Sequence, residues 1–162
     1  MSFNSFLPDI LATILGGIIL TLFFFFTKEK IFPSPNINGL WKLIVYTEKT
    51  IYNPFRSMTL EYDVLLWSEN NNIYGTVEKC YEDSVNGKIR FEGDRRTTGV
   101  VQGSINKNYF AKDKIVLHIT ENGRRRQSSH YYNLIVNDDV IISGTFQSLI
   151  AKQEGVAFLI KA

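Results

Sequence analysis

The stretch SMTLEYDVLLW, residues 57 to 67, decides the fold. Every second side chain in it is apolar, at Met58, Leu60, Tyr62, Val64 and Leu66. The polar side chains in its first half fall between these positions, at Thr59, Glu61 and Asp63. Successive side chains of an extended strand point to opposite faces. The stretch therefore predicts a β-strand with one buried face and one solvent-exposed face.

The same alternation continues through the chain after Gly39, in short runs without a helical period. We expect strands at residues 39–47, 57–67, 73–81, 88–92, 98–105, 114–120, 126–136, 140–146 and 156–160. Turn-forming residues separate these strands at 69–72, 86–87, 122–123 and 137–139. Two of these turns contain Asn-Gly, which suits a tight hairpin with two positive φ angles. Consecutive hairpins with no helix between them predict an antiparallel meander.

Four glycines, Gly75, Gly99, Gly103 and Gly144, fall inside the predicted strands. Glycine weakens a strand unless the sheet must coil sharply, as it does in a small barrel. We therefore expect an all-β fold, a small eight-stranded antiparallel meander barrel of lipocalin-like form. An open β-sandwich is the alternative, because the same alternation would serve it.

A continuous apolar segment, ILATILGGIILTLFFFFT at residues 10–27, precedes the strands. As a helix it would be about 27 Å long, close to the hydrocarbon thickness of a bilayer, which predicts one N-terminal transmembrane α-helix. Lys28 and Lys30 follow it, so the positive-inside rule predicts an outside N-terminus and a cytoplasmic barrel. The expected organisation is a tail (1–9), the helix with its basic flank (10–30), a proline linker (31–37) and the barrel domain (38–162).

Small residues lie four apart within this segment, notably Ala12, Gly16 and Gly17. Such spacing places them along one side of a helix, where a second backbone can approach closely. We expect self-association through this side.

The composition limits the possible functions. The chain has 18 Lys and Arg against 16 Asp and Glu, and the net charge of +2 disfavours a nucleic acid polymer as partner. Its one cysteine, Cys80, excludes an internal disulfide. His118 and His130 have no partners at metal-ligand spacing, and no catalytic motif occurs. We expect no enzyme activity, no cofactor and no metal.

Arginines gather at two predicted strand ends. Arg95 and Arg96 precede one strand, and Arg124, Arg125 and Arg126 follow the Asn122-Gly123 turn. Forked guanidinium groups at a barrel mouth suit phosphates, and tyrosine rings stack on bases. We therefore expect a small-nucleotide site made by these arginines with Tyr62 and Tyr131. A basic, solvated turn is the alternative for each arginine. The pattern leaves open which face of residues 126–136 points inward.

The layout then resembles a known family. A membrane segment, the linker IFPSPN (31–36) and the opening strand GLWKLIVY (39–46) precede a small meander barrel. This arrangement is similar to the transmembrane β-barrel effectors of bacterial anti-phage CBASS operons, of the CD-NTase-associated protein 15 type. The family has two membrane spans, and this chain shows one.

The resemblance implies that the barrel binds a cyclic dinucleotide made during infection. Binding would drive self-association of the membrane segments, disruption of the cell inner membrane and abortive cell death. The competing hypothesis is a membrane-tethered lipocalin-like barrel that binds an apolar small molecule or scaffolds a membrane complex.

Overall fold

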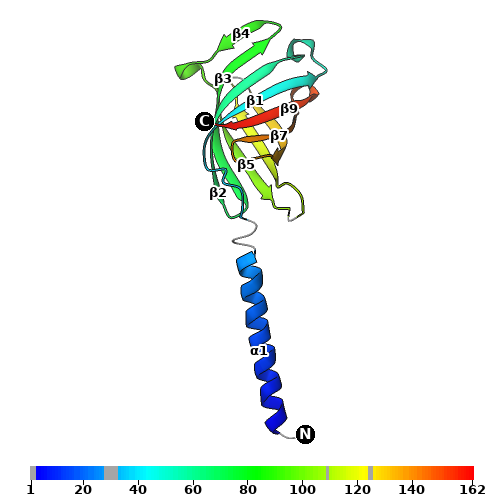
Figure 1. The fold of residues 1–162 in the computed structure, drawn as a ribbon. Coiled ribbons are helices and arrows are strands. Elements are labelled where there is room, and N and C mark those ends of the chain that lie inside the picture. Colours follow the sequence, from blue (N-terminus) through cyan, green and yellow to red (C-terminus); the bar gives the residue numbers. More distant parts are fainter. Residues whose placement is uncertain (1–2, 28–32, 109, 124–125) are drawn as a thin grey trace. The chain divides into compact units, whose positions relative to one another are not determined.

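The structure, a computed structural model, describes residues 3–27, 33–108, 110–123 and 126–162. The chain divides into two compact units, Met1–Ser34 and Pro35–Ala162. The first unit holds the helix α1 (Phe3–Phe26), and the second holds every strand of the described chain (Figure 1).

Helix α1 suits a bilayer. Its segment Pro8–Phe26 is long and apolar enough to span a membrane, and none of this segment is buried against other parts of the protein. The hydroxyls of Thr13 and Thr21 donate to the backbone oxygens of Asp9 and Gly17, each at 2.8 Å. Because these hydroxyls are satisfied inside the helix, they need no water.

The helix begins earlier than expected. We expected a tail over residues 1–9, but α1 starts at Phe3 and continues through Pro8. Proline has no N–H, so it removes the hydrogen bond that would reach the carbonyl of Asn4, close to the helix N-terminus. One lost bond in the second turn does not end the helix.

Over the residues that the structure describes, the second unit holds nine strands and three short 3-10 helices. The strands are β1 (Gly39–Lys49), β2 (Thr59–Glu69), β3 (Asn72–Ser84), β4 (Gly87–Arg90), β5 (Thr98–Asn106), β6 (Lys114–Asn122), β7 (Gln127–Val136), β8 (Ile141–Ser148) and β9 (Gln153–Lys161). The 3-10 helices are η2 (Asn53–Phe55), η3 (Gly93–Arg95) and η4 (Ile150–Lys152). All nine expected strands are present, within a few residues of their expected bounds.

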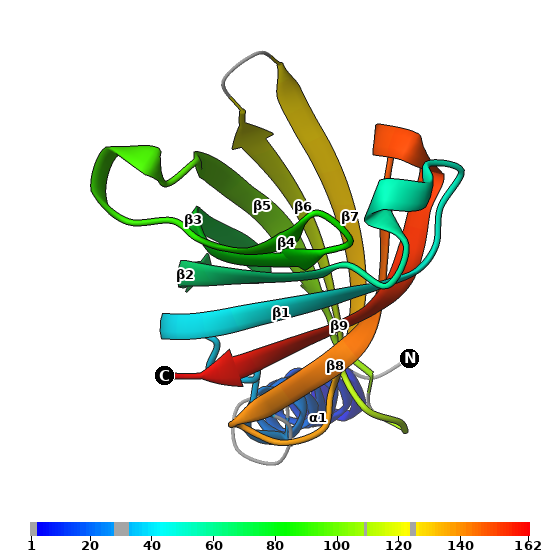
Figure 2. The same ribbon diagram turned by 90° about the horizontal axis from the view of Figure 1, so that it is seen from above.

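Eight of the strands close into an antiparallel barrel. Around the ring the order is β1-β2-β3-β5-β6-β7-β8-β9, and β9 pairs again with β1 (Figure 2). The short strand β4 pairs with the outer part of β3 and forms a hairpin beyond the ring. The predicted barrel is confirmed, and the sandwich alternative is wrong.

Apolar side chains fill the inner face of the ring. They form a single cluster that includes Leu43, Val64, Leu117, Leu134 and Leu159. At the end where the chain enters β1, which we call the entry end, the indole N–H of Trp41 donates to the carbonyl of Ile37 at 2.7 Å. Both of these residues are 1% exposed. The segment that leads into the barrel therefore also closes this end of its core.

The pairing of β2 with β3 contains a β-bulge. Glu61 pairs with Tyr81 and Tyr62 pairs with Lys79, so Cys80 is the extra residue. A bulge reverses the alternation, so residues beyond it exchange faces. This difference from a simple strand was not expected from the sequence.

The two Asn-Gly pairs do not form the expected turns. At 86–87, Gly87 has φ of +109° but Asn86 has no positive φ, and at 122–123 neither residue has one. In the first case Ser84 pairs with Gly87, so the two loop residues are Val85 and Asn86. The type I′ turn is therefore excluded at both places, because it needs positive φ at both central residues.

The strand glycines lie where neighbouring backbones approach closely, as expected. An added Cβ at Gly75, Gly99, Gly103 or Gly144 would meet a carbonyl oxygen of the adjacent strand. At Gly144 it would overlap the oxygen of Asn133 and lie 2.8 Å from the Cα of Leu134. Gly155 is a fifth such position, against the oxygen of Tyr46.

We predict that Gly144→Ala destabilises the barrel by about 1 to 3 kcal/mol, because the methyl group must displace the backbone of β7. The measurement is urea denaturation of residues 35–162. The control is Thr145→Ala, an exposed neighbour on β8, whose effect should stay within about 0.5 kcal/mol. Equal stabilities of the two variants would contradict the close-approach argument.

Candidate functional site

Buried polar residues gather at the end of the barrel opposite the entry end. Five polar or charged side chains are buried among the described residues: Thr47, Glu121, His130, Ser148 and Gln153. Each lies near the end of β1, β6 or β8 or near the start of β7 or β9. In an antiparallel ring these strand ends meet at one side, which we call the polar end.

Glu121 lies at the centre of this group. It continues the inward alternation of Ile115, Leu117 and Ile119 along β6, and it is 8% exposed. One carboxylate oxygen accepts the hydroxyl of Tyr62 at 3.2 Å, and the other accepts the hydroxyl of Thr97. Two strands, β2 and β6, and the segment before β5 thus meet at a single buried carboxylate.

His130 lies beside Glu121 on β7. Its Nε2 is 3.8 Å from a carboxylate oxygen of Glu121 and has no hydrogen-bond partner within the described part of the chain. Burial lowers the pKa of His130, and the Glu121 carboxylate opposes this shift. The imidazole is therefore neutral at neutral pH, with one buried nitrogen unsatisfied.

Tyr62 keeps its proton in this setting. Burial and the adjacent Glu121 carboxylate raise its pKa well above the ordinary value. Tyr62 therefore acts as a hydrogen-bond donor to Glu121, which holds the carboxylate in place.

A second charged pair borders the polar end. Lys79 and Glu82 form an ion pair at 2.5 Å, with side chains 15% and 21% exposed. Their strand partners Tyr62 and Leu60 point inward, so the bulge at Cys80 turns both ends of this pair to the inner face. The Lys79 ammonium also lies 5.0 Å from the centre of the Phe91 ring. The polar end thus carries charge of both signs.

A separate cleft of about 160 Å³ lies on the outer surface. Outward residues of β1 to β4 and the segment up to Arg96 line it: Lys42, Glu61, Asp63, Cys80, Tyr81, Arg90, Phe91, Glu92 and Arg96. Lys42 pairs with Glu61 at 3.5 Å, and Arg96 pairs with Asp63 at 3.3 Å and with Glu78 at 3.1 Å. Its three basic side chains are balanced by three carboxylates, so it offers no excess charge to a phosphate. Burial and Asp63 raise the pKa of the Cys80 thiol, which does not favour a reactive thiolate.

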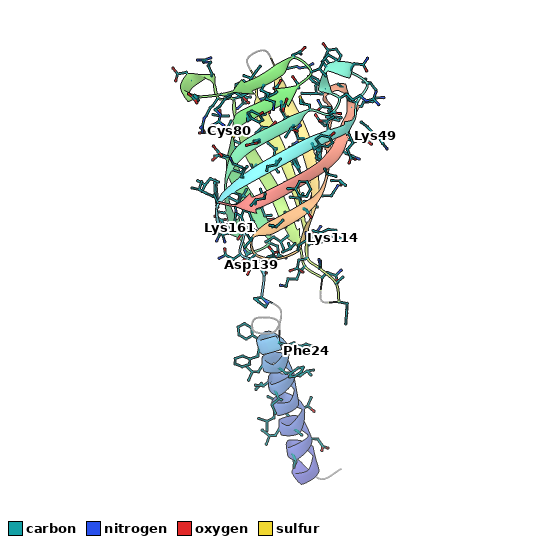
Figure 3. The ribbon with its side chains drawn as sticks, turned by 45° about the horizontal axis from the view of Figure 1, so that its top comes forward. Phe24, Lys49, Cys80, Lys114, Asp139 and Lys161 are labelled. Atoms are coloured by element: carbon teal, nitrogen blue, oxygen red, sulfur yellow. The ribbon has the colours of Figure 1, made fainter. Side chains whose placement is uncertain are left out.

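Figure 3 labels residues at both ends of the barrel. Cys80 and Lys49 lie toward the polar end, whereas Lys114, Asp139 and Lys161 lie at the entry end. Of the arginines that the sequence singled out, Arg95, Arg96 and Arg126 lie at strand ends on the polar side. Arg95 ends η3 just before β5, and Arg126 comes just before β7.

Several of the predicted site residues lie at the polar end. Arg95 and Arg126 are exposed at the polar end, whereas Arg96 is held by its two carboxylates and by the Phe91 carbonyl at 3.3 Å. Arg124 and Arg125 lie outside the described residues. Tyr62 is inside the barrel, directly at the polar end.

Tyr131 does not join them. It points outward from β7, is 43% exposed and stacks on the ring of His118, with 4.5 Å between centroids. Tyr131 points outward because successive side chains of a strand alternate between its two faces, and the inward face of β7 carries His130, Tyr132 and Leu134. Of the two predicted tyrosines, therefore, one is at the polar end and one is on the outer wall.

Sequence reasoning missed Glu121, Thr97 and His130 as site residues. A usable signal existed for Glu121, because it is a charged residue at the fourth inward position of an otherwise apolar strand face. No sequence signal existed for Thr97. It lies before β5, outside any strand pattern, and only the folded chain brings its hydroxyl to Glu121. Within the described ranges, no group of three or more His, Cys, Asp or Glu side chains is arranged to hold a metal ion.

No protein-family model, curated protein or solved structure matches the chain. The function must therefore be argued from its own residues.

We predict that the barrel loses stability as the pH falls below about 6.5, the ordinary pKa of histidine. The unfolded chain takes up a proton there, whereas buried His130 does not because its pKa is lowered. The measurement is urea denaturation of residues 35–162 between about pH 7.5 and pH 5.5.

His130→Gln should make this decline shallower. The control is His118→Gln, which replaces the histidine of the outer wall and leaves Glu121 and His130 in place. A decline of the same steepness in the His130 variant would remove His130 as its cause.

Proposed function

We propose that this protein is a membrane-anchored effector of the CBASS anti-phage kind, in which the barrel senses a cyclic dinucleotide. The observation that carries the proposal is the polar end, where Arg95 and Arg126 are exposed and where Glu121 forms a buried polar network with Tyr62 and His130. The proposed function is recognition and assembly and needs no catalysis.

The chemistry of the polar end suits a nucleotide. Guanidinium groups bind phosphate oxygens through paired, charge-assisted hydrogen bonds. A carboxylate accepts hydrogen bonds from the N–H groups of a base, and the buried Nε2 of His130 has no hydrogen-bond partner among the described residues. These groups supply what a phosphate and a base edge require.

The packed interior also bears on the competing hypothesis. A carrier of an apolar small molecule keeps a cavity inside its barrel. Here the inner positions belong to one packed apolar cluster, with Leu43, Val64 and Leu117 fully buried. A cavity of about 330 Å³ is lined in part by Ile115 and Leu134 of this cluster, but the buried polar groups gather at the polar end, which favours a nucleotide there. Scaffolding of a membrane complex remains the second candidate.

Helix α1 is the proposed anchor. Its apolar length supports a single span, and the lysines that follow it support an outside N-terminus and a cytoplasmic barrel. In the proposed effector this membrane is the cell inner membrane. Lys28 and Lys30 themselves lie outside the described residues.

Self-association is proposed to run through the small residues of α1, which are Ala12, Gly16 and Gly17. An added Cβ at either glycine meets nothing within 4 Å, so this face is open to a second helix. Contacts between membrane helices are weak, about 1 kcal/mol each. When a ligand holds barrels together, however, the attached helices meet at a high effective concentration. Clustered helices would then disturb the bilayer.

We predict that residues 35–162 bind one member of a panel of cyclic di- and trinucleotides with a Kd of about 1 μM or lower, measured by calorimetric titration. Exchanging Arg95 and Arg126 together for alanine should weaken this binding several-fold or more, because hydrogen bonds to charged groups contribute about 1.5 to 3 kcal/mol each.

The matched control is the pair Lys112→Ala and Lys114→Ala, two exposed lysines at the entry end, which should leave the affinity unchanged. No binding across the panel would contradict the sensor hypothesis and favour the scaffold. Equal affinity of the arginine variant would place the ligand elsewhere on the barrel.

We predict that Gly17→Leu in the full chain abolishes ligand-induced crosslinking in membranes, because the larger side chain keeps neighbouring helices apart. Nucleotide binding should persist, since the substitution lies outside the barrel unit. Ile19→Leu, a change of shape without added volume, is the control. Undiminished crosslinking of Gly17→Leu would show that this face of α1 is not the contact.

A further inference from the structure

The entry end of the barrel is ringed by exposed apolar side chains. Phe110, in the loop between β5 and β6, is fully exposed at 101%. Between about a third and two thirds of each of the others is exposed: Leu40, Trp67, Tyr74, Val140 and Ile141. All six lie at the start of β1, β3 or β8, at the end of β2, or in a loop at the same end. We call this set the apolar rim.

The apolar rim continues from strand to strand. Trp67 pairs with Tyr74 across β2 and β3, and their rings stack with 6.5 Å between centroids. The Ala162 N–H donates to the Leu40 carbonyl and the Lys161 N–H to the Val140 carbonyl, which joins β1, β9 and β8 at this end. The rim therefore surrounds the end of the ring and is not confined to one side.

The chain segment between α1 and the barrel limits what can cover the apolar rim. α1 ends at Phe26, and the chain is packed in the barrel core again at Ile37. Fully extended, the chain between them spans about 40 Å. If α1 crosses a bilayer, as proposed above, the entry end can never be further than this from the membrane surface. The rim is thus held at a high local concentration of lipid.

We infer that the apolar rim docks on the surface of the bilayer, with Phe110 inserted among the lipids. The geometry favours a lipid surface over a second copy of the chain. A bilayer covers a complete rim at once, whereas a second barrel would cover one side of it. Exposed aromatic and aliphatic side chains are typical of interfacial membrane contacts.

The net charge of the entry end indicates which lipid headgroups it can dock on. Four lysines in its loops and strand ends, Lys107, Lys112, Lys114 and Lys161, are matched by Glu69, Asp113, Asp138 and Asp139. Lys107 pairs with Asp113 at 3.5 Å, and the Asp138 carboxylate accepts the N–H groups of Val140 and Ile141. With no excess positive charge, docking depends on apolar contact. It therefore works on zwitterionic lipid and changes little with salt.

The test is a depth measurement on the full chain in phosphatidylcholine vesicles. In a Cys80→Ser background, a polarity-sensitive fluorophore is attached at Phe110→Cys and, in separate samples, at Leu149→Cys or Leu20→Cys. Leu149 is the matched control, because it is 75% exposed in the turn before η4 at the polar end. Leu20 lies inside α1 and reports on the anchor. Quenching is measured with spin-labelled lipid and with aqueous iodide.

Docking predicts that lipid quenching at position 110 exceeds that at position 149 by about twofold or more, as expected for an interfacial contact. Iodide should show the reverse order. Equal values at 110 and 149, with position 20 quenched by lipid, would overturn docking and leave the anchor intact. Iodide quenching at position 20 would overturn the anchor as well. Fluorophore self-quenching at 110 without lipid quenching would mean that a second copy covers the rim, which also overturns the inference.

The native chain gives an independent measurement. It has two tryptophans, of which Trp41 is 1% exposed and Trp67, in the rim, is 41% exposed. Brominated phosphatidylcholine should quench Trp67, and Trp67→Phe should remove most of this quenching. Unquenched Trp67 in vesicles that hold the protein would overturn docking without any labelled variant.

Discussion

Antiparallel pairing of the first barrel strand, β1, with the last, β9, is the constraint on which the rest of the structure depends. It gives every strand of the ring two neighbours, so the ring has no free edge to recruit other chains. Closure also demands strong coiling, and Gly155 lies at this seam, where an added Cβ would overlap the oxygen of Tyr46 and lie 2.9 Å from the nitrogen of Glu48. The other inward glycines relieve the same crowding between the remaining strands. The small residues thus make possible a ring that the large inward residues then fill.

Closure also determines what the two ends can do. Toward the entry end the inner positions are apolar, and Trp41 completes the packing with its indole N–H bonded to the Ile37 carbonyl, so apolar contacts dominate that end of the core. At the polar end, Glu121 is buried and depends on two hydroxyl donors, and His130 keeps one nitrogen unsatisfied. A buried carboxylate and an unpaired nitrogen contribute less to stability than apolar side chains of similar size would. Stability alone therefore does not account for these residues, which supports a binding role for the polar end.

Much of this fold could be predicted from the sequence, because alternation, turn residues and glycine positions are local signals. Residues 57–67 indicated which face of β2 is buried, and Gly144 indicated a sharply coiled strand. The bulge at Cys80 could not be predicted, since it depends on how β3 is shared between β2, β4 and β5. Nor could the site at Glu121, since its partners Tyr62 and Thr97 are 59 and 24 residues away in sequence. Likewise the outward position of Tyr131 follows from the register of β7, because polar residues on both faces of that strand gave no preferred side.

The packed interior bears on how an event at the polar end can reach the membrane. Signalling along the barrel would require its core to have two packings, yet close-packed cores have few alternative arrangements and resist gradual deformation. Association imposes no such requirement. Under the proposed function, a ligand that joins two barrels would bring their α1 helices together through chain segments of about 40 Å at most, and contacts of about 1 kcal/mol would then suffice to hold the helices together. In this scheme the barrel stays rigid, and docking of its entry end would strengthen the effect by confining neighbouring copies to the plane of the bilayer. Ligand binding at the polar end would then act on the membrane by changing how many copies associate, and the shape of each barrel would stay the same.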